Sequence, residues 1–469
     1  MIISTIYLIF ITVIFGIITV VIFERKNPVK IVAWIIPQLV LPILGFVLYI
    51  FFGQDKRRKL LISRRRFNQI IRFWENNQFS VEQLLKDKSL IQLASMIEKN
   101  FDAKIYDGSS IRIFTDGKSK FESLIHHLEG ANSHIHLQYY IFEDDEIGNR
   151  IRDILIQKAK EGVEVRVIYD DLGCWKVKKH FFKEMEEAGI LVSRFLPVVF
   201  KLLTSRINYR NHRKIVVIDG RIGYIGGMNI ADRYINGNYL GMWRDTHILI
   251  EGKGAQGLQS SFVVDWFFSE RKLLTQSEYF PHIQSKGDVK LQVLPGGPFS
   301  SWHELMMGIY RAITSATRYI YIQTPYFLPT ESFLISLQVA AMSGVDVRIM
   351  VPAESDTWMT SIGTQAYYAD VLTAGVKIFE YAGGFIHAKT IVIDDKLSII
   401  GSANIDFRSL EHNFEVSTFI YDEPTAIEMR NIFIQDSRKC NRLTINRWNV
   451  RPRSQKIKES IVRFFSPLL

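Results

Sequence analysis

Two stretches of the chain carry histidine and lysine in one repeated frame. Residues 210–229 read RNHRKIVVIDGRIGYIGGMN, and residues 386–404 read IHAKTIVIDDKLSIIGSAN. Both follow the pattern H-x-K-x4-D-x6-G-[GS]-x-N, and the second histidine comes 175 residues after the first. The repeated side chains are His212, Lys214, Asp219 and Asn229 in the first copy and His387, Lys389, Asp394 and Asn404 in the second. Two complete copies at one spacing indicate a pair of functional motifs.

An imidazole beside an ammonium group suits a tetrahedral phosphate. The lysine neutralises the charge of the phosphate oxygens, and the imidazole serves as a nucleophile or a proton carrier. The asparagine of each copy, Asn229 or Asn404, can donate a further hydrogen bond to the phosphate. For a single copy, a strand with a surface histidine and lysine would be an equally good interpretation. The second copy favours catalysis.

Strands must position these side chains. The runs IVVID and TIVID are apolar and β-branched, which predicts that each motif lies on a buried strand. Successive side chains on a strand point to opposite faces, so the histidine and lysine share one face and the aspartate lies on the other. We therefore expect Asp219 and Asp394 to act as structural supports. The chain should turn at Asp219-Gly220 and return as a second strand to the glycine pair Gly226-Gly227.

Two further carboxylates are candidates for orienting the imidazoles. Asp245, in WRDTH, comes 33 residues after His212, and Glu415, in HNFEVS, comes 28 residues after His387. A buried carboxylate can hold the tautomer of a catalytic imidazole, as it does in other sites based on histidine.

The two motifs resemble the double HKD motif of the phospholipase D superfamily. The resemblance implies that both motifs meet across a pseudo-twofold axis in a single active site. It also implies that one histidine forms a phospho-histidine intermediate, that the other protonates the leaving group, and that no metal is required. The first histidine, His212, is then the nucleophile by family analogy, although the pseudo-symmetry leaves the two roles exchangeable.

Composition bounds the partners and cofactors. The 469 residues carry a net charge of +10 and a pI near 9.3, which favours an anionic partner, either nucleic acid or acidic lipid. The two cysteines, Cys174 and Cys440, form no disulfide framework. No cluster of His, Cys and carboxylates has the spacing of zinc ligands. We therefore expect neither a metal nor another cofactor.

The N-terminal region predicts a membrane hairpin. Residues 2–23 and 31–53 carry no charge, and about 20 helical residues cross a hydrocarbon core. A signal peptide is the alternative for the first stretch, but a basic n-region is missing. Residues 55–66 then hold seven Lys or Arg against one Asp, which places the catalytic body on the cytoplasmic side of the cell membrane. Among these bases, Leu60, Phe67, Ile71 and Trp74 recur at roughly helical spacing, which fits a helix on an anionic leaflet or a solvated linker helix.

From about residue 101, strand-like and helix-like stretches alternate, which predicts α/β architecture. The sequence also repeats beyond the motifs, since EGVEVRVIYD (161–170) matches SGVDVRIMVP (343–352) and IHLQYYIF (135–142) matches IYIQTPYF (320–327). Two homologous halves are implied, with a boundary near residues 276–286. The expected order is a transmembrane hairpin (1–53), a basic juxtamembrane linker (54–100), and two phospholipase D-like α/β/α domains (101–280 and 281–469) sharing one active site.

Two further segments and a pair of tyrosines have two interpretations each. The stretch 194–210, which leads into the first motif, could be a lid that delivers a lipid headgroup or a core helix. Residues 438–463 carry nine Lys or Arg against one Glu, which fits contact with a membrane surface or a solvated tail. Tyr140 and Tyr326 could line the mouth of the site or belong to the core.

Within the superfamily, the chain resembles the bacterial cardiolipin synthases from residue 28 to about residue 415. The resemblance rests on AWIIPQLVLPILGFVLYIFFG, QYYIFEDDEIG, RNHRKIVVIDG, GGMNIADRY, WRDTH, TPYFLPT, IHAKTIVID and GSANIDFRS. It implies transfer of a phosphatidyl group between two phosphatidylglycerol molecules, with phosphatidylglycerol and anionic membrane lipid as partners. The alternatives are a phospholipase D-type hydrolase or another phosphatidyltransferase. The hairpin argues against a nuclease and so against nucleic acid, and two intact motifs argue against a scaffold without activity. The sequence does not specify an oligomeric state.

Overall fold

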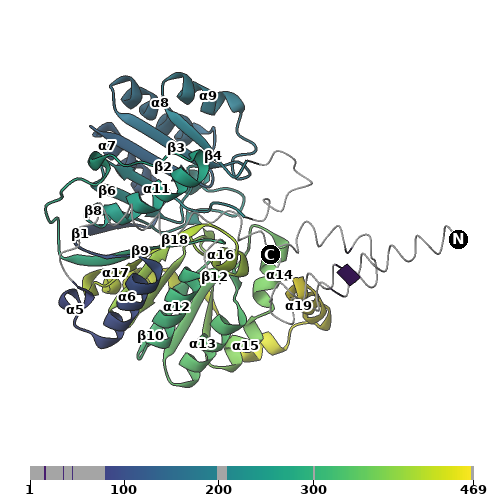
Figure 1. Cartoon of the computed structure of the whole chain (residues 1–469). Coiled ribbons are helices and arrows are strands. Elements are labelled where there is room, and N and C mark those ends of the chain that lie inside the picture. Colours follow the sequence, from purple (N-terminus) through teal and green to yellow (C-terminus); the bar gives the residue numbers. More distant parts are fainter. Residues whose placement is uncertain are drawn as a thin grey trace. The chain divides into compact units, whose positions relative to one another are not determined.

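The computed structural model describes residues 80–197, 209–298 and 302–465, with isolated positions at 15, 16, 35 and 45 (Figure 1). The predicted hairpin, apart from those positions, and the basic segment 55–66 lie outside these ranges, as do residues 198–208 of the predicted lid. Within the described residues, none of the helices is both long and apolar enough to cross a bilayer.

A mixed sheet of 15 strands runs through both halves of the chain. The first half contributes β1 (Ile105–Phe114), β2 (His134–Tyr139), β3 (Glu164–Asp170), β4 (Leu191–Phe195), β5 (Ile215–Ile218), β6 (Ile222–Gly226) and β8 (His247–Gly252). The second half contributes β9 (Val289–Gly296), β10 (Tyr319–Gln323), β12 (Asp346–Pro352), β13 (Lys377–Tyr381), β15 (Thr390–Ile393), β16 (Leu397–Gly401), β18 (Glu415–Ile420) and β19 (Cys440–Leu443). Short strands outside the main sheet are β7 (Trp243–Arg244), β11 (Phe327–Leu328), β14 (Phe385–Ile386) and β17 (Ile405–Asp406).

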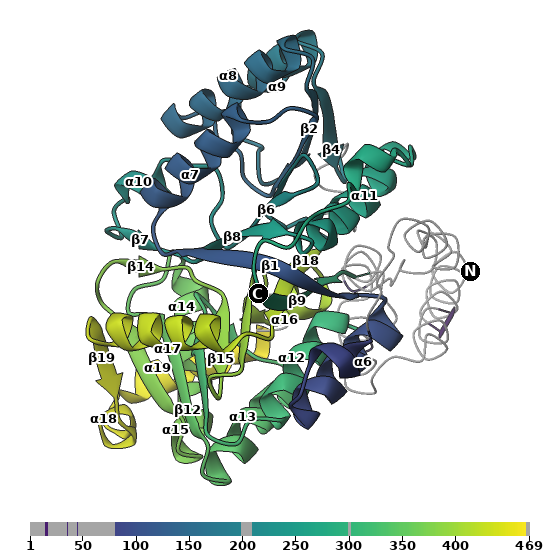
Figure 2. The same ribbon diagram turned by 90° about the vertical axis from the view of Figure 1, so that its left-hand side faces the viewer.

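The strand order shows the predicted pseudo-symmetry. From the centre outward, the first half runs β1-β8-β6-β5-β2-β3-β4 and the second runs β9-β18-β16-β15-β10-β12-β13, with β19 added at the edge. Antiparallel pairing of β1 with β9 joins the halves. The strands β2, β3 and β4 of the first half and β10, β12 and β13 of the second pair in parallel, whereas the strands nearer the centre, and β19 with β13, pair antiparallel. Two copies of one α/β unit therefore form a continuous sheet (Figure 2).

Helices cover both faces of the sheet, as the alternating pattern predicted. The helices of the first half are α7 (Gly117–Glu129), α8 (Glu146–Lys160), α9 (Lys179–Glu187), α10 (Arg233–Asn236) and α11 (Ala255–Glu270), followed by the 3-10 turn η4 (Ser277–Tyr279). Those of the second half are α12 (Glu304–Thr314), α13 (Glu331–Met342), α14 (Trp358–Gln365), α15 (Tyr368–Thr373), α16 (Phe407–Glu411) and α17 (Glu423–Ser437). Each half has its own apolar core on one face, and a third core with residues of both halves lies on the other face. This shared core makes the two halves one body.

Both motifs form the predicted hairpins, β5–β6 and β15–β16. Their turns carry left-handed backbone, with φ of 51° at Asp219, 63° at Gly220, 56° at Asp394 and 60° at Asp395. The expectation that the histidine and lysine lie on the strand itself is wrong in one respect. The strands β5 and β15 begin one residue after each lysine, at Ile215 and Thr390. The backbone N–H groups of His212 and His387 instead donate to carbonyl oxygens in the opposite half of the chain.

The segments flanking the two halves fold onto the second half. Residues 80–100 of the predicted linker contain α5 (Val81–Leu84) and most of α6 (Lys88–Phe101). Their buried side chains, such as Leu93 and Ile97, pack in the core of the second half. At the other end, β19 pairs with β13 and is followed by α18 (Ile445–Asn449) and α19 (Arg453–Phe465). The basic C-terminal stretch is therefore folded on the body, with Trp448 buried.

Candidate active site

Each motif is joined by backbone hydrogen bonds to the opposite half. The N–H of His212 donates to the carbonyl oxygen of Phe414 at 2.9 Å, and the N–H of His387 donates to that of Arg244 at 2.7 Å. Parallel bridges precede both contacts, Asn211 with Phe414 and Ile386 with Arg244. Because Phe414 and Arg244 immediately precede Glu415 and Asp245, each histidine is brought to the carboxylate of the other half.

The second histidine is held closely. Nδ1 of His387 lies 2.7 Å from Oδ2 of Asp245, and the other oxygen of Asp245 accepts from the backbone N–H of Thr246 at 2.7 Å. Nζ of Lys389 lies 2.9 Å from the same Nδ1 and also donates to the carbonyl oxygen of His387. Asp245 is completely buried, so the carboxylate, imidazole and ammonium form a compact group.

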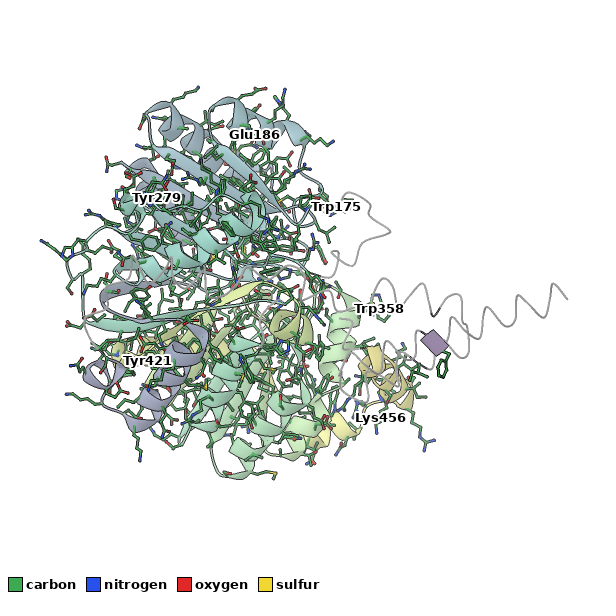
Figure 3. The ribbon with its side chains drawn as sticks, viewed as in Figure 1. Trp175, Glu186, Tyr279, Trp358, Tyr421 and Lys456 are labelled. Carbon is green, nitrogen blue, oxygen red and sulfur yellow. The ribbon has the colours of Figure 1, made fainter. Side chains whose placement is uncertain are left out.

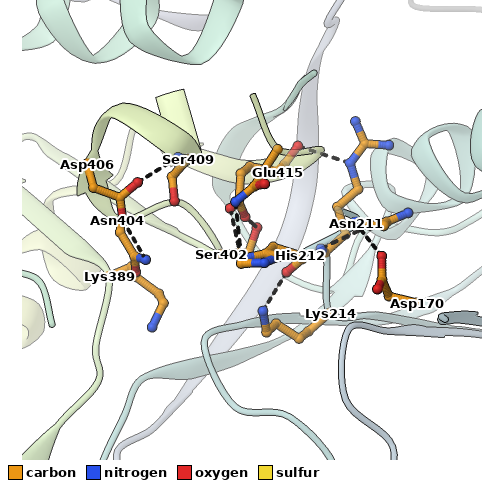
Figure 4. A network of polar contacts seen from close by, with 12 residues as sticks. Asp170, Asn211, His212, Lys214, Lys389, Ser402, Asn404, Asp406, Ser409 and Glu415 are labelled. Carbon is orange, nitrogen blue, oxygen red and sulfur yellow. Dashed lines mark hydrogen bonds and ion pairs between the residues drawn. The ribbon is translucent and has the colours of Figure 1, made fainter. Parts of the chain in front are cut away.

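The first histidine has a looser arrangement. Nδ1 of His212 lies 3.4 Å from Oε1 of Glu415 and 3.4 Å from Nδ2 of Asn413. The other oxygen of Glu415 accepts from the hydroxyl of Ser402 at 2.5 Å, and Lys214 donates to the carbonyl oxygen of His212 (Figure 4). Each predicted imidazole-orienting carboxylate therefore contacts an imidazole, but the pairs are exchanged between the halves.

Burial lowers the pKa of both motif lysines. The pKa of Lys214 falls to about 8 and that of Lys389 to about 7, while nearby carboxylates, Asp245 and Glu415 among them, oppose both shifts. Burial also lowers the pKa of His387 to about 4, helped by the charge of Lys389 and opposed by Asp245.

The motif aspartates lie away from the imidazoles, where the strand alternation placed them. Asp219 accepts from the backbone N–H groups of Asn132, Ser133 and His134 at 2.8–3.0 Å. Asp394 accepts from the equivalent N–H groups of residues 317–319 at 2.7–2.9 Å. Each carboxylate fixes the turn before strand β2 or β10, which are the neighbours of the motif strands. These contacts are those of structural supports.

The motif asparagines are tied to their own halves. Nδ2 of Asn229 donates to the hydroxyl of Tyr234 at 3.1 Å, and its Oδ1 accepts from the N–H of Ile141 at 3.2 Å. Nδ2 of Asn404 donates to Asp406 at 2.9 Å, and its buried Oδ1 has no hydrogen-bond partner among the described residues. A second N–H on each amide nitrogen could still reach a phosphate, so that role stays a prediction.

Sequence reasoning missed two buried arginine–aspartate pairs that support the motifs. Arg213 donates to Asp265 of α11 at 2.6 Å and to the carbonyl oxygen of Glu415 at 3.0 Å. Arg244 contacts Asp436 of α17 at 2.8 Å. The sequence contained a signal for these pairs, because it repeats the spacing of the aspartates in both halves. Asp265 follows Asp245 by 20 residues, and Asp436 follows Glu415 by 21.

A buried basic group behind Asp245 was also missed. Lys120, His247 and Tyr139 are almost completely buried in the first half, and Nζ of Lys120 donates to the hydroxyl of Tyr139 at 3.1 Å. Burial lowers the pKa of Lys120 and of His247 well below their ordinary values, and Asp245 acts on Lys120 in the opposite direction. His247 and Tyr139 belong to WRDTH and QYYIFEDDEIG, but the HKD pattern itself gives no signal for Lys120.

Tyr140 and Tyr326, which could line the mouth of the site or belong to the core, have different contacts. The ring of Tyr140 lies 4.0 Å from that of His212, centroid to centroid, and Nζ of Lys214 lies 5.5 Å from its centre. The hydroxyl of Tyr326 donates to Asp356 at 2.6 Å. Tyr140 therefore contacts the site directly.

In the part of the chain that the structure describes, no three His, Cys, Asp or Glu side chains are grouped as metal ligands.

Comparison with known proteins decides the family. The family model described as "Cardiolipin synthase, PLD-like domain" matches residues 124–266 and 309–437, and "Phospholipase_D-nuclease N-terminal" matches residues 6–54. The major cardiolipin synthase ClsA of Bacillus subtilis (strain 168) is 41% identical over 470 residues, covering 95% of each chain. The chain belongs to the cardiolipin synthase family. Members of this family, within the phospholipase D superfamily, are phosphatidyltransferases.

Other relatives of the family agree. The cardiolipin synthase of Oceanobacillus iheyensis (strain DSM 14371) is 40% identical over 465 residues, covering 96% of both chains. Among solved structures, the phosphatidylserine synthase of Haemophilus influenzae Rd KW20 superposes with a TM-score of 0.58 at 16% identity, covering 80% of this chain and 97% of its own. That likeness shows a shared phospholipase D-like fold with two repeated domains, as the sequence predicted.

Proposed function

We propose that this chain is a cardiolipin synthase that transfers a phosphatidyl group from one phosphatidylglycerol to another. The observation that carries the proposal is the exchanged pairing of the two histidines with Asp245 and Glu415 in one body. Two imidazoles, each beside a lysine and a carboxylate, can perform the two halves of a double displacement on phosphorus. The family membership supports lipid phosphodiesters as the substrates.

In the first step, His212 attacks the phosphorus of one phosphatidylglycerol. The bond from phosphorus to the glycerol oxygen breaks, and His387, which enters this step as the imidazolium, protonates the departing glycerol and becomes neutral. In the second step, His387 takes the proton of a glycerol hydroxyl on a second phosphatidylglycerol. That oxygen attacks the phosphatidyl-histidine, which releases cardiolipin and restores His212. The assignment of His212 as nucleophile follows the family, since pseudo-symmetry leaves the roles exchangeable.

Four side chains stabilise the phosphate oxygens in this proposal, namely Lys214, Lys389, Asn229 and Asn404. The buried lysines supply charge where water is scarce, so their effect on the oxyanion is large. The reaction needs no metal, because proton transfer and charge stabilisation both come from the protein.

The membrane arrangement is part of the proposal. The N-terminal family match at residues 6–54 covers nearly the whole predicted hairpin, residues 1–53. We infer a multi-pass protein of the cell membrane with a basic linker at 54–100 and the domains 101–280 and 281–469 on the cytoplasmic side. Its substrate phosphatidylglycerol then lies in the leaflet next to the site, and nucleic acid is not a partner.

Product analysis tests the reaction. The full chain in detergent micelles is given radiolabelled phosphatidylglycerol as the sole lipid, without added metal. Cardiolipin with equimolar glycerol is the expected result. Phosphatidic acid would show that water is the acceptor and that the chain is a hydrolase on the same scaffold. His212→Ala and His387→Ala should each abolish turnover, and substantial synthesis by either variant would exclude a shared site.

A further inference from the structure

Helix α19 has an unusual distribution of apolar and polar side chains. Its buried face carries Gln455, Glu459 and Val462, whereas Ile457 and Ile461 are 61% and 55% exposed. These two isoleucines are four residues apart and lie on one face of the helix. α13 also exposes apolar side chains, Ile335 and Val339 among them, so the charges around the two isoleucines distinguish α19.

Polar contacts hold α19 in this orientation. Glu459 is buried and accepts three hydrogen bonds from the guanidinium of Arg451 at 2.8–3.0 Å. Arg463 forms an ion pair with Asp370 at 2.8 Å, and Gln455 donates to Gln365 at 3.3 Å. Because ionic groups fix the helix to the body, the outward position of the isoleucines is built into the fold.

The charges around the isoleucines have one sign. The exposed charged residues of α19 are Arg453, Lys456 and Lys458, besides Arg463, which is paired with Asp370, and its only acidic residue is the buried Glu459. Trp358, at the start of α14, is 68% exposed, and α14 packs against α19. In Figure 3, Trp358 and Lys456 lie on the same side of the body.

We propose that α19 is an interfacial helix that inserts Ile457 and Ile461 into an anionic lipid leaflet. An apolar stripe flanked by lysine and arginine matches the acyl chains and the acidic headgroups of such a leaflet. The charge pattern selects lipid over a protein partner with mixed charges. The inference deepens the proposed function, since it gives the catalytic body an attachment to the leaflet that holds phosphatidylglycerol, separate from the N-terminal hairpin.

Site-directed fluorescence quenching tests the insertion. The full-length Ile457→Cys variant, labelled with a thiol-reactive fluorophore, is reconstituted into vesicles whose phosphatidylcholine has brominated acyl chains, with or without phosphatidylglycerol. Burial raises the pKa of the native Cys174 thiol, and that of Cys440 to about 12, so labelling near neutral pH favours the introduced cysteine. The matched control is Val339→Cys on α13, where Val339 is 53% exposed. The parent chain, taken through the same labelling reaction, gives the background from the native cysteines.

Strong quenching at position 457 and little at position 339 is expected, with a severalfold larger effect when phosphatidylglycerol is present. Lys456→Glu combined with Lys458→Glu should remove most of that dependence on phosphatidylglycerol. Equal quenching at positions 457 and 339 would overturn the proposal. Disulfide-linked dimers of Ile457→Cys without lipid quenching would show that a second copy covers the helix instead. Quenching is measured without any enzymatic turnover. A negative result would therefore overturn the insertion of α19 without bearing on the proposed reaction, which the product analysis tests.

Discussion

The carboxylate of Asp245, in the first half of the chain, lies 2.7 Å from Nδ1 of His387 in the second half. The reciprocal contact, Glu415 with His212, is longer at 3.4 Å. The two imidazoles thus have related but unequal surroundings. The predictions below concern this exchanged pairing and the groups that support it.

Asp245→Asn should reduce kcat by roughly two to four orders of magnitude, because an amide no longer stabilises the imidazolium or selects its tautomer. The side-chain oxygen can still accept from Thr246, so the fold should survive. Cardiolipin formation with phosphatidylglycerol measures the effect. Glu251→Gln, on the same strand β8, is the control and should keep parental activity. A loss of less than twofold in Asp245→Asn would contradict the orienting role.

Gly227→Ala should reproduce the loss seen in Asp245→Asn. A Cβ at position 227 would lie 2.2 Å from Oδ1 of Asp245, so the carboxylate must move away from His387. Gly130→Ala is the matched control, because its Cβ would approach no atom closer than 3.5 Å. Activity and the thermal unfolding midpoint are measured for both variants. Full activity in Gly227→Ala would mean that the position of Asp245 is not critical.

The value of kcat/KM should fall as the pH rises through about 7 to 8, since the pKa values of Lys389 and Lys214 lie there in the free enzyme. Loss of the ammonium charge removes stabilisation of the phosphate oxygens. Initial rates across the pH range measure the decline. A profile that stayed flat up to the ordinary lysine value of 10.5 would contradict the lowered pKa values.

Stability should change with pH in the opposite direction. Between about pH 7 and 10.5 the unfolded chain keeps Lys389 protonated while the folded chain does not. The unfolded state then binds more protons, so the contribution of this group to the free energy of unfolding rises with pH. Lys389→Met should flatten the rise of the unfolding midpoint over this window. An identical pH dependence in the variant and the parent would exclude the effect.

Asp265→Asn should cost about 3–5 kcal/mol of stability, because the buried guanidinium of Arg213 would lose its counter-charge. Since Arg213 also holds the carbonyl of Glu415, synthesis should fall as well. Chemical denaturation of the full chain in detergent gives the free energy. Glu187→Gln, which breaks an exposed ion pair with Lys183, is the control and should change little. Equal stability of both variants would contradict a structural role for Asp265.

The repeated sequence was sufficient to predict the fold of the two halves. The β-branched runs after Lys214 and Lys389 predicted the motif strands, and Asp219-Gly220 predicted the turn between two of them. The structure shows that both turn residues have a positive φ. Family membership and a phospholipase D-like fold were confirmed by the comparisons. The chemical roles of the motif residues, the membrane hairpin and the domain limits stay predictions.

The exchanged pairing was beyond the reach of sequence spacing. Asp245 and His387 are 142 residues apart, and a strand pair, β7 with β14, brings them together. The places of α5, α6 and α18 were missed for a related reason. Their charged surfaces resemble a solvated linker or tail, and only tertiary packing shows that Leu93, Ile97 and Trp448 are buried.

The exchange of carboxylates also has an evolutionary consequence. In a dimer of identical subunits, both imidazoles would have to keep the same carboxylate partner, because one gene would encode both. A single chain that contains both units is free of that constraint. Here the glycine–aspartate combination of Gly227 and Asp245 faces one histidine, and the serine–glutamate combination of Ser402 and Glu415 faces the other. In a single chain the two imidazoles can therefore have different surroundings, as the distances of 2.7 Å from His387 to Asp245 and 3.4 Å from His212 to Glu415 show.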